Sequence, residues 1–387
     1  MPDRWDGGLA NYLRKVGVSL AARGHAPAVF VLSQRDAQWQ DGQITIYEVK
    51  KVEIQGRAKF RGFHRVLAQY LNARRLATAV WRIHRAKPLD IVQASSYMAP
   101  GYKLLGNDRI PIVCRVSSYT PMLRSAFGTQ RNSAAYLSDW LEIRQVLDAD
   151  ASFAPSRFVA NTYERVEGFQ PKVIRSPLSL PNVELDPSFY HAHLDDKAYL
   201  LFFGTLSRIK GVDLLAKVIP KILRWHTALS IVFIGRDDGL PGGQKMFDYI
   251  SAECHSFAHK LHYWPPLPKD QLYPIIANAI GIVMPSRVDN YPNACLEAQS
   301  LGVPVVGTDS SSLEEMIVDG ETGFLATNGD SKSLCEEIER LLDLSAAQSE
   351  QMRKNILAAN QAIRREDRVG QLTVFYQETI DSFHTRA

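Results

Sequence analysis

The sequence predicts an α/β protein made of two Rossmann-like domains that face each other across a cleft. Short apolar, β-branched runs alternate with amphipathic helical segments in both halves of the chain, as in doubly wound parallel sheets. Residues 178–197 contain prolines and acidic residues without periodicity, which is typical of a linker. With 387 residues, each half of the chain is long enough to bury its own core.

We expect an N-terminal domain over residues 1–180, a C-terminal domain over residues 195–365, and a final helix over residues 366–387 that crosses back to the first domain. In the first domain, the apolar runs predict strands at residues 28–32, 44–52, 90–94, 111–116, 151–154 and 172–176. In the second domain, they predict strands at residues 199–203, 229–235, 261–264, 280–284 and 303–307.

The composition is that of an ordinary globular protein, with 45% hydrophobic and 22% charged residues. A net charge of +4 without a DNA-binding motif does not indicate a nucleic-acid partner. The four cysteines form no C-x-x-C pair, so neither a zinc site nor a disulfide framework is indicated. No apolar run approaches the roughly 18 residues that span a bilayer. No signal peptide is visible, and we therefore expect a cytoplasmic protein.

Residues 285–324 carry the functional signal. A strand, a polar loop, a helix and a second strand follow one another here, which predicts a βαβ unit with its binding loop at the carboxyl end of a strand. Asp289 lies in the loop and Glu297 on the helix. An anion can bind the N–H groups at the helix N-terminus, and Glu297 can accept hydrogen bonds from sugar hydroxyls. Alternatively, Asp289 is a loop capping residue and Glu297 a solvated helix residue.

The ordered motifs of this stretch resemble the signature of the retaining glycosyltransferases of family 4, which have the GT-B fold. The family pattern runs P-S, E-G-F-P, L-E-A, G-x-P-V-V and E-x-x-x-D-G-x-T-G. The matching residues are Pro285, Ser286, Asp289, Tyr291, Pro292, Leu296, Glu297, Ala298, Gly302, Pro304, Val305, Val306, Glu315, Asp319, Gly320, Thr322 and Gly323. Asp289 stands where the family usually has its first Glu, so the charge is kept but its reach is one methylene shorter.

The resemblance implies a metal-independent hexosyltransferase that uses a nucleotide sugar as its substrate and needs no cofactor. It implies that Glu297 holds the ribose and that Asp289 contacts hydroxyls of the transferred sugar. The backbone between them is expected to bind the phosphates or the sugar, through Asn290, Tyr291, Pro292 and Asn293. Nothing resembles a dedicated covalent nucleophile, so we expect front-face attack with the leaving phosphate as the base.

A second loop supplies the positive charge that a diphosphate leaving group requires. It begins at Gly204, after a predicted strand, and contains Arg208 and Lys210. Lys210 matches the K of the family's K-G motif. The family's usual Arg is replaced by Thr205, and Arg208 could take over its role. The alternative for both cations is a solvated loop residue, and for Arg208 the two interpretations stay open.

The N-terminus resembles the family's Gly-Gly loop and helix at Gly7 and Gly8. Gly8 is therefore expected to contact the donor phosphates or the acceptor, although a simple tight turn is the alternative. Family members place a β-strand before this loop, and here that first strand is expected to be missing. Ser117 stands near a position where the family often has His, so we transfer no role to it.

The acceptor is expected to be a glycan or a lipid-linked molecule in envelope or exopolysaccharide biosynthesis, because related enzymes often use such acceptors. Residues 57–87 combine many cations with interleaved apolar residues, which predicts a basic amphipathic helix. Such a helix can lie on anionic lipid at the inner face of the membrane. The alternative is a solvated helix packed on a sheet.

Two acidic pairs match the letters of metal motifs, Asp148 with Asp150 and Asp237 with Asp238. We interpret both as structural loop residues and expect no metal site. A second interpretation of the whole chain is a catalytically silent, glycosyltransferase-like binding subunit. The expected lack of the first strand and the departures from the family pattern at Asp289, Thr205 and Ser117 favour it.

Overall fold

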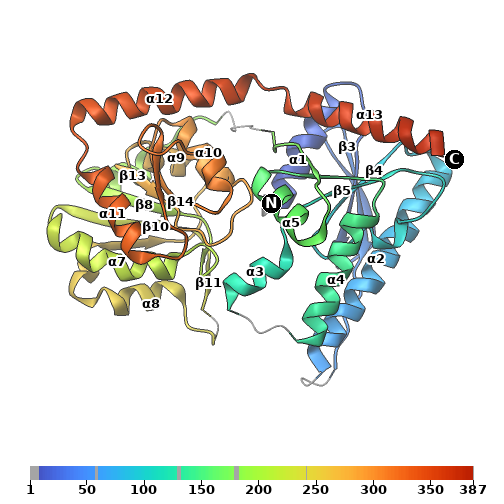
Figure 1. Ribbon diagram of the computed structural model, residues 1–387, viewed down its shortest axis with the longest axis horizontal. Helices are drawn as coiled ribbons and strands as arrows, with labels where there is room; N and C mark the ends of the chain where they lie inside the picture. Colours follow the sequence, from blue (N-terminus) through green and yellow to red (C-terminus); the bar gives the residue numbers. More distant parts are fainter. Residues whose placement is uncertain (1–7, 57–59, 129–131, 178–182, 241, 387) are drawn as a thin grey trace. The chain divides into compact units, whose positions relative to one another are not determined.

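The computed structural model describes residues 8–56, 60–128, 132–177, 183–240 and 242–386 (Figure 1). The chain divides into two compact units. The first comprises Met1–Arg124, Gln130–Pro177 and Asp367–Ala387, and the second comprises Ser125–Thr129 and Leu178–Glu366. Both contain parallel strands connected by helices, so the predicted α/β class is confirmed.

The elements of the first unit are α1 (Gly8–Ala21), β1 (Ala28–Ser33), β2 (Ala37–Asp41), β3 (Ile44–Lys50), α2 (Arg61–Ala86), β4 (Val92–Ser95), η2 (Tyr102–Leu104), β5 (Ile112–Arg115), α3 (Thr120–Phe127), α4 (Ser133–Asp148), β6 (Ala151–Ala154), α5 (Arg157–Glu167), β7 (Lys172–Val173) and α13 (Arg368–Arg386). Strands β4, β5, β6 and β7 form a parallel sheet in that order. Strands β1, β3 and β2 form a second sheet, in which β2 is an antiparallel hairpin strand that the sequence analysis did not predict.

The described residues contain no strand that pairs with both β1 and β4. Residues 1–7, which precede α1 and include Gly7, lie outside the described residues. Helices α1 and α13 cover one face of the parallel sheet, where Phe375 packs edge-on against Phe153 with ring centroids 5.6 Å apart. The hydroxyl of Tyr376 donates a hydrogen bond of 2.6 Å to Oε1 of Gln93. The last helix of the chain thus belongs to the core of the first unit.

The elements of the second unit are α6 (Ser188–His193), β8 (Ala198–Phe203), β9 (Leu206–Ser207), α7 (Val212–Trp225), β10 (Leu229–Ile234), β11 (Asp237–Gly239), α8 (Met246–Glu253), η3 (His255–Lys260), β12 (Leu261–Trp264), α9 (Lys269–Ala277), β13 (Gly281–Val283), α10 (Asn293–Ser300), β14 (Val305–Thr308), η4 (Ser312–Glu315), β15 (Gly323–Ala326), α11 (Ser331–Leu342) and α12 (Ala346–Arg365). The prediction of irregular chain over residues 178–197 is wrong at α6, because a helix of six residues is too short to show a period.

A parallel sheet with the order β12-β10-β8-β13-β14-β15 forms the centre of the second unit. Alternate residues of β8 face opposite sides, as the strand period requires. Leu200 and Phe202 pack with residues of α7, α8 and α11, whereas Tyr199 and Leu201 pack with residues of α9 and α10. Helices therefore cover both faces, and the binding edge is left to the loops at the carboxyl ends of the strands.

Candidate functional site

The strand order of the second unit reverses between β8 and β13. The chain runs from β8 outward through β10 and β12 on one side, and from β13 outward through β14 and β15 on the other. The loops that follow β8 and β13 therefore leave the sheet in opposite directions, and ligands of open α/β sheets bind at such a point. The predicted residues Gly204, Arg208 and Lys210 lie on the first of these loops, and Asp289 lies on the second.

Lys210 and Asp289 are brought together at this point. The Nζ of Lys210 lies 2.6 Å from Oδ2 of Asp289, whose side chain is 10% exposed. Ser286 donates its hydroxyl to the same oxygen at 3.1 Å, and the backbone N–H of Asn290 donates to Oδ1 at 3.0 Å. Asp289 thus accepts a local backbone N–H, as expected of a loop capping residue. It also forms an ion pair with Lys210, the cation predicted for the facing loop.

Arg287 holds the two loops together, and the sequence analysis did not identify it. Its guanidinium donates two hydrogen bonds to the carboxylate of Asp213, with N–O distances of 2.6 and 2.9 Å. The same group donates to the backbone oxygen of Arg208 at 2.6 Å. At Gly211, φ is +68° and a Cβ would lie 1.7 Å from the backbone oxygen of Pro285. Only glycine fits this close approach of the two loops.

The N-terminus of α10 lies at the end of the second loop. Pro292 is its N-cap, and no side chain caps the helix, so the N–H groups of its first turn are available to an anion. Tyr291, just before the cap, has a φ of +66°, and its N–H donates to Ser312 Oγ at 2.6 Å. A residue with a Cβ in this region carries strain, which occurs frequently in binding loops. Asn293 is the first residue of α10.

Glu297 lies one turn into α10 and pairs with Lys269, the first residue of α9. Their Nζ and Oε2 atoms are 2.6 Å apart, and the Glu297 side chain is only 13% exposed. Glu297 is therefore not the solvated helix residue of the alternative interpretation. Burial raises the pKa of the neighbouring Tyr273 hydroxyl, and the Glu297 carboxylate raises it further, so this phenol stays neutral. The sequence analysis missed Lys269, which follows a proline-rich loop without any motif.

The two predicted glycines lie in different units. Gly204 follows β8 with a φ of +136°, and its N–H donates to the backbone oxygen of Ile234 at 2.9 Å. No atom lies within 4 Å of the position that a Cβ on Gly204 would take, so the backbone is open there. Gly8 is the first residue of α1 in the first unit. Its assignment to a ligand stays a prediction.

In the first unit, Glu142 of α4 holds the loops that follow β4 and β5. Its carboxylate accepts the N–H of Met98 at 2.9 Å and the hydroxyl of Thr120. Met98 and Ala99 both have positive φ values, 63° and 45°. Burial raises the pKa of the Glu142 carboxyl. These strained loops at the carboxyl ends of parallel strands are the part of the first unit where a ligand would be expected to bind.

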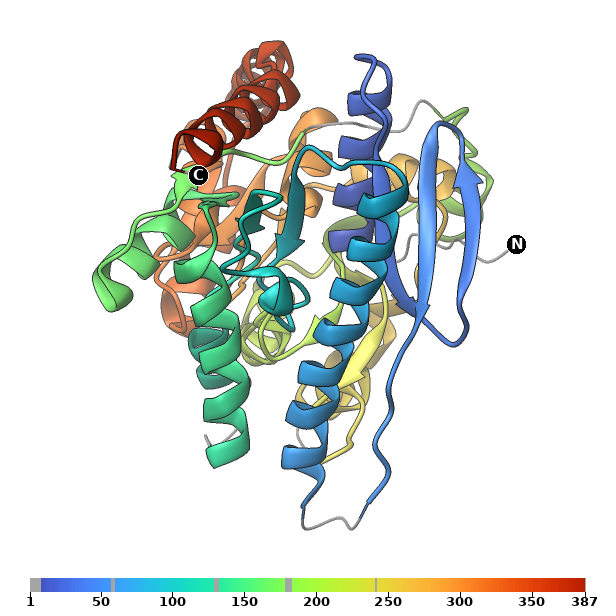
Figure 2. The ribbon, with the colours of Figure 1, turned by 90° about the vertical axis from the view of Figure 1, so that its right-hand side faces the viewer.

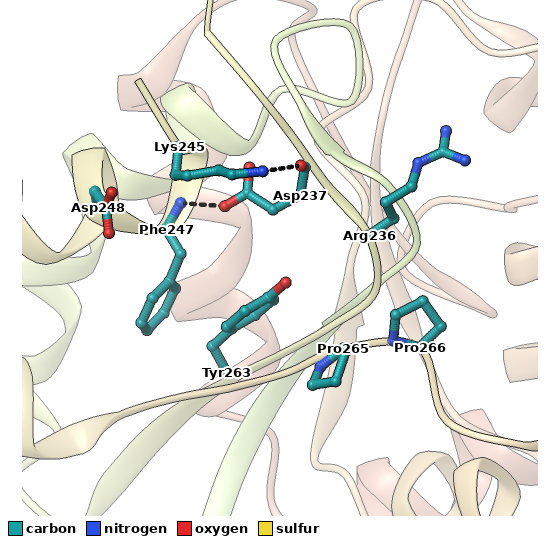
Figure 3. Close-up of a pocket in the computed structure, with 8 residues that line it drawn as sticks. All are labelled: Arg236, Asp237, Lys245, Phe247, Asp248, Tyr263, Pro265 and Pro266. Carbon is teal, nitrogen blue, oxygen red and sulfur yellow. Dashed lines mark hydrogen bonds between the residues drawn. The ribbon is translucent and has the colours of Figure 1, made fainter. Parts of the chain in front are cut away.

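A pocket of about 400 Å³ lies beside the loops after β10 and β12 (Figure 3). No predicted site residue lines it, and the polar groups of Asp237 and Lys245 already have partners. Asp237 accepts the N–H groups of Gly239, Met246 and Phe247 at 2.8 to 3.0 Å, which caps α8. Lys245 donates to the backbone oxygen of Asp237 at 3.2 Å. We assign no ligand to this pocket, and the interpretation of Asp237 as structural is confirmed.

The other acidic pair is also structural. Asp148 pairs with Arg144 at 2.5 Å, and Asp150 accepts the N–H of Ile112 at 2.8 Å. Over the described ranges, no three His, Cys, Asp or Glu side chains gather in a group that could hold a metal ion. Nor does this part of the chain contain a helix long and apolar enough to cross a bilayer. Of the basic stretch 57–87, residues 57–59 lie outside the described residues.

Two protein families match the chain, one to each unit. The family described as Glycosyltransferase Family 4 matches residues 6–177, and the one described as Glycosyl transferases group 1 matches residues 188–358. D-inositol 3-phosphate glycosyltransferase of Acidothermus cellulolyticus is 27% identical over 220 residues, which cover 52% of this chain and 48% of that protein. The enzyme of the same name from an Arthrobacter species is 30% identical over 166 residues, which cover 42% and 38%. The chain thus spans less than half the length of these curated relatives.

Solved structures resemble the chain over nearly its full length. Sucrose-phosphate synthase from Thermosynechococcus elongatus has a TM-score of 0.80 at 17% identity, covering 97% of this chain and 94% of that one. Anabaena Alr3699/HepE, solved with UDP and glucose, has a TM-score of 0.70 at 17% identity, covering 97% and 96%. At these identities the likeness shows the fold alone. Together with the two family matches, it establishes that the chain belongs to glycosyltransferase family 4 and has the GT-B fold.

Proposed function

We propose that this protein is a retaining, metal-independent hexosyltransferase that moves a sugar from a nucleotide-sugar donor to a glycan or lipid-linked acceptor. One observation carries the proposal. At the point where the strand order reverses, the loops after β8 and β13 bring a lysine, a buried carboxylate and an uncapped helix N-terminus together. This arrangement suits a diphosphate linked to a sugar, because it offers positive charge to the phosphates and a carboxylate to the hydroxyls.

The cationic groups bind and stabilise the leaving diphosphate. Lys210 and Arg208 lie on the loop after β8, and the N–H groups of Asn293 and Ala294 lie in the first turn of α10. As the bond from the anomeric carbon to the phosphate oxygen breaks, its electron pair passes to that oxygen, and the growing charge is met by these donors. The acceptor hydroxyl forms the new bond on the same face of the sugar, and its proton goes to the leaving phosphate.

The two carboxylates take separate roles in this proposal. Asp289 accepts hydrogen bonds from hydroxyls of the transferred sugar, and Glu297 accepts them from the ribose hydroxyls of the nucleotide. Lys269 holds Glu297 in position through the 2.6 Å ion pair. We infer that the nucleotide is UDP by analogy with Anabaena Alr3699/HepE, which was solved with UDP and glucose. We place the enzyme in the cytoplasm and in envelope or exopolysaccharide assembly, with an acceptor that the first unit binds.

Thermal shift of the purified chain with UDP-, GDP- and ADP-sugars tests the donor site. One of these nucleotides should raise the Tm of the wild-type chain, since a ligand that binds only the folded state stabilises it. The Glu297→Ala variant should lose most of that shift. Donor consumption with acceptor extracts, measured with and without EDTA, then tests the reaction. If Glu297→Ala shows the same Tm shift as the wild type, Glu297 does not belong to the donor site. If the chain binds a nucleotide sugar but neither transfers nor hydrolyses it, the protein is a catalytically silent subunit and not an enzyme.

A further inference from the structure

Helix α2 of the first unit carries an excess of positive charge. It contains six arginines, Arg61, Arg65, Arg74, Arg75, Arg82 and Arg85, and neither Asp nor Glu. All six are exposed. Arg75 donates to the backbone oxygen of Lys50 at 3.0 Å, but none of the six forms an ion pair with a carboxylate of the described residues. A helix whose cations have no counter-charge from the protein is attracted to an anionic surface.

The same helix presents apolar side chains to the outside. Phe63, Leu67 and Tyr70 follow the i, i+4, i+7 spacing of one helix face and are all exposed. Val66 and Ala73, which adjoin this face, are buried. The apolar stripe of α2 is therefore wider than the part that packs on its own unit, and its outer part faces away from that unit. A helix that only packs on a sheet has no need of this exposed outer part.

Helix α4 lies alongside α2 and extends the exposed apolar surface (Figure 2). Their N-terminal turns meet, since a Cβ on Gly62 would lie 2.9 Å from the Cβ of Ala134. Tyr136, Leu137 and Trp140 of α4 are exposed, Trp140 to 42%. Two neighbouring helices thus place large apolar side chains on the surface at the same end of the pair.

The short helix η2 connects the two apolar stripes. Lys103 lies over the ring of Tyr70 at 4.2 Å from its centroid, and the rings of Tyr102 and Trp140 are 6.2 Å apart. The exposed side chains of α2, η2 and α4 therefore form one continuous surface. We call it the aromatic-basic face, and it consists of Phe63, Leu67, Tyr70, Arg74, Tyr102, Lys103, Tyr136, Leu137 and Trp140.

A hollow of about 350 Å³ lies on this face, lined by Tyr70, Arg74, Ala77, Thr78, Trp81 and Lys103. Its lining contains two cations and two aromatic rings but no acidic residue. Arginine and lysine bind phosphate oxygens, and aromatic side chains with a polar group favour the boundary between water and hydrocarbon. The chemistry of the hollow fits the phosphate of a lipid headgroup.

We propose that the aromatic-basic face docks the protein on the surface of an anionic lipid bilayer. Arg74 and Lys103 face the phosphates, and the positive charge of α2 attracts the protein to the membrane. The apolar and aromatic side chains of α2 and α4 enter the boundary of the acyl region, as in amphipathic segments that lie in the membrane plane. The proposal concerns a surface of the first unit, so it stands apart from the donor site of the second unit and is tested by binding rather than by activity.

Co-sedimentation with lipid vesicles tests the proposal on the full chain. Vesicles of phosphatidylcholine alone are compared with vesicles that also contain phosphatidylglycerol, at low and high salt. Three double variants are measured: Arg74→Gln with Lys103→Gln, Phe63→Ser with Leu67→Ser, and the control Lys221→Gln with Trp225→Ser. The control removes an exposed cation and aromatic ring from α7 of the second unit, where Lys221 lies 4.6 Å from the ring centroid of Trp225.

The wild-type chain should bind the anionic vesicles and release them at high salt. The Arg74 and Lys103 variant should bind roughly 10- to 30-fold more weakly, because each cation near the surface adds to the attraction. The Phe63 and Leu67 variant should lose binding to a similar degree, while the control binds like the wild type. The proposal would be overturned if all variants bound the vesicles equally, or if the wild type bound vesicles with and without phosphatidylglycerol to the same extent. Binding to duplex DNA that depends on Arg74 and Lys103 in the same way, without binding to the vesicles, would also overturn it.

Discussion

Lys210 and Asp289 are 79 positions apart in the sequence, and their side chains form an ion pair of 2.6 Å between the loops after β8 and β13. The pair joins the two sides of the point where the strand order reverses. A bound diphosphate would compete with Asp289 for the ammonium group of Lys210, because both partners are anions. Asp289 therefore lowers the electrostatic attraction of Lys210 for a diphosphate, even though the ammonium group has further N–H donors.

Variants of this pair should separate phosphate binding from sugar binding. In Lys210→Met, the affinity for UDP should fall roughly 10- to 100-fold, the effect of losing a charged hydrogen bond. In Asp289→Asn, UDP should bind at least as tightly as in the wild type, because the competing anion is gone, whereas transfer should fall. Calorimetry with UDP and a transfer assay measure the two effects. A loss of UDP affinity in Asp289→Asn as large as in Lys210→Met would contradict the division of roles.

Lys269 should act on the nucleotide through Glu297. We expect Lys269→Met to weaken UDP binding by less than Glu297→Gln does, and the double variant to be no weaker than Glu297→Gln alone. Such non-additivity is the signature of two residues that act as a unit. Lys332→Met is the matched control, since Lys332 pairs only with the exposed Glu336 at 3.7 Å on α11. Additive losses in the double variant would show that Lys269 contacts the ligand independently.

Arg287 should be important for the stability of the second unit. Its side chain and that of Asp213 are 18% and 14% exposed, so Arg287→Ala leaves a mostly buried carboxylate without its partner. We expect the free energy of unfolding to fall by about 2 to 4 kcal/mol, near the range for breaking a buried pair. In the control, Arg236→Ala, the pair with Asp238 is 64% and 44% exposed, and little change is expected. Denaturant unfolding of both full-length variants is the measurement, and equal losses would contradict this prediction.

The Glu142 carboxyl should make stability depend on pH. Burial raises its pKa in the folded chain above its usual value of 4.5, so the folded state holds the proton more tightly than the unfolded state. Its contribution to stability is therefore complete below pH 4.5 and is lost as the pH rises through the folded-state pKa. Glu142→Gln cannot titrate, so its Tm relative to the wild type should increase as the pH rises from 4.5. A difference that stays constant over this pH range would argue against the raised pKa.

The sequence by itself determined the α/β class, the βαβ unit that carries Asp289 and Glu297, and the basic loop with Lys210. These features depend on local patterns: an apolar run of strand length, a proline at the start of a helix and a glycine at its end. Because the motif order is also local, the family could be recognised from it. The hairpin strand β2 (Ala37–Asp41) and the short helix α6 (Ser188–His193) were not predicted from the sequence, because each is too short to show a clear hydrophobic period.

Only the tertiary structure decided which side chains meet. Lys269 precedes Glu297 by 28 positions, and Asp213 precedes Arg287 by 74. Neither pair has a spacing that a helix or strand period could reveal. Their contacts follow from the position of β8 beside β13 in the sheet and from the loop conformations that the close approach at Gly211 permits. Strand order is set by packing over the whole unit, and for that reason these partners cannot be predicted from the residues around them.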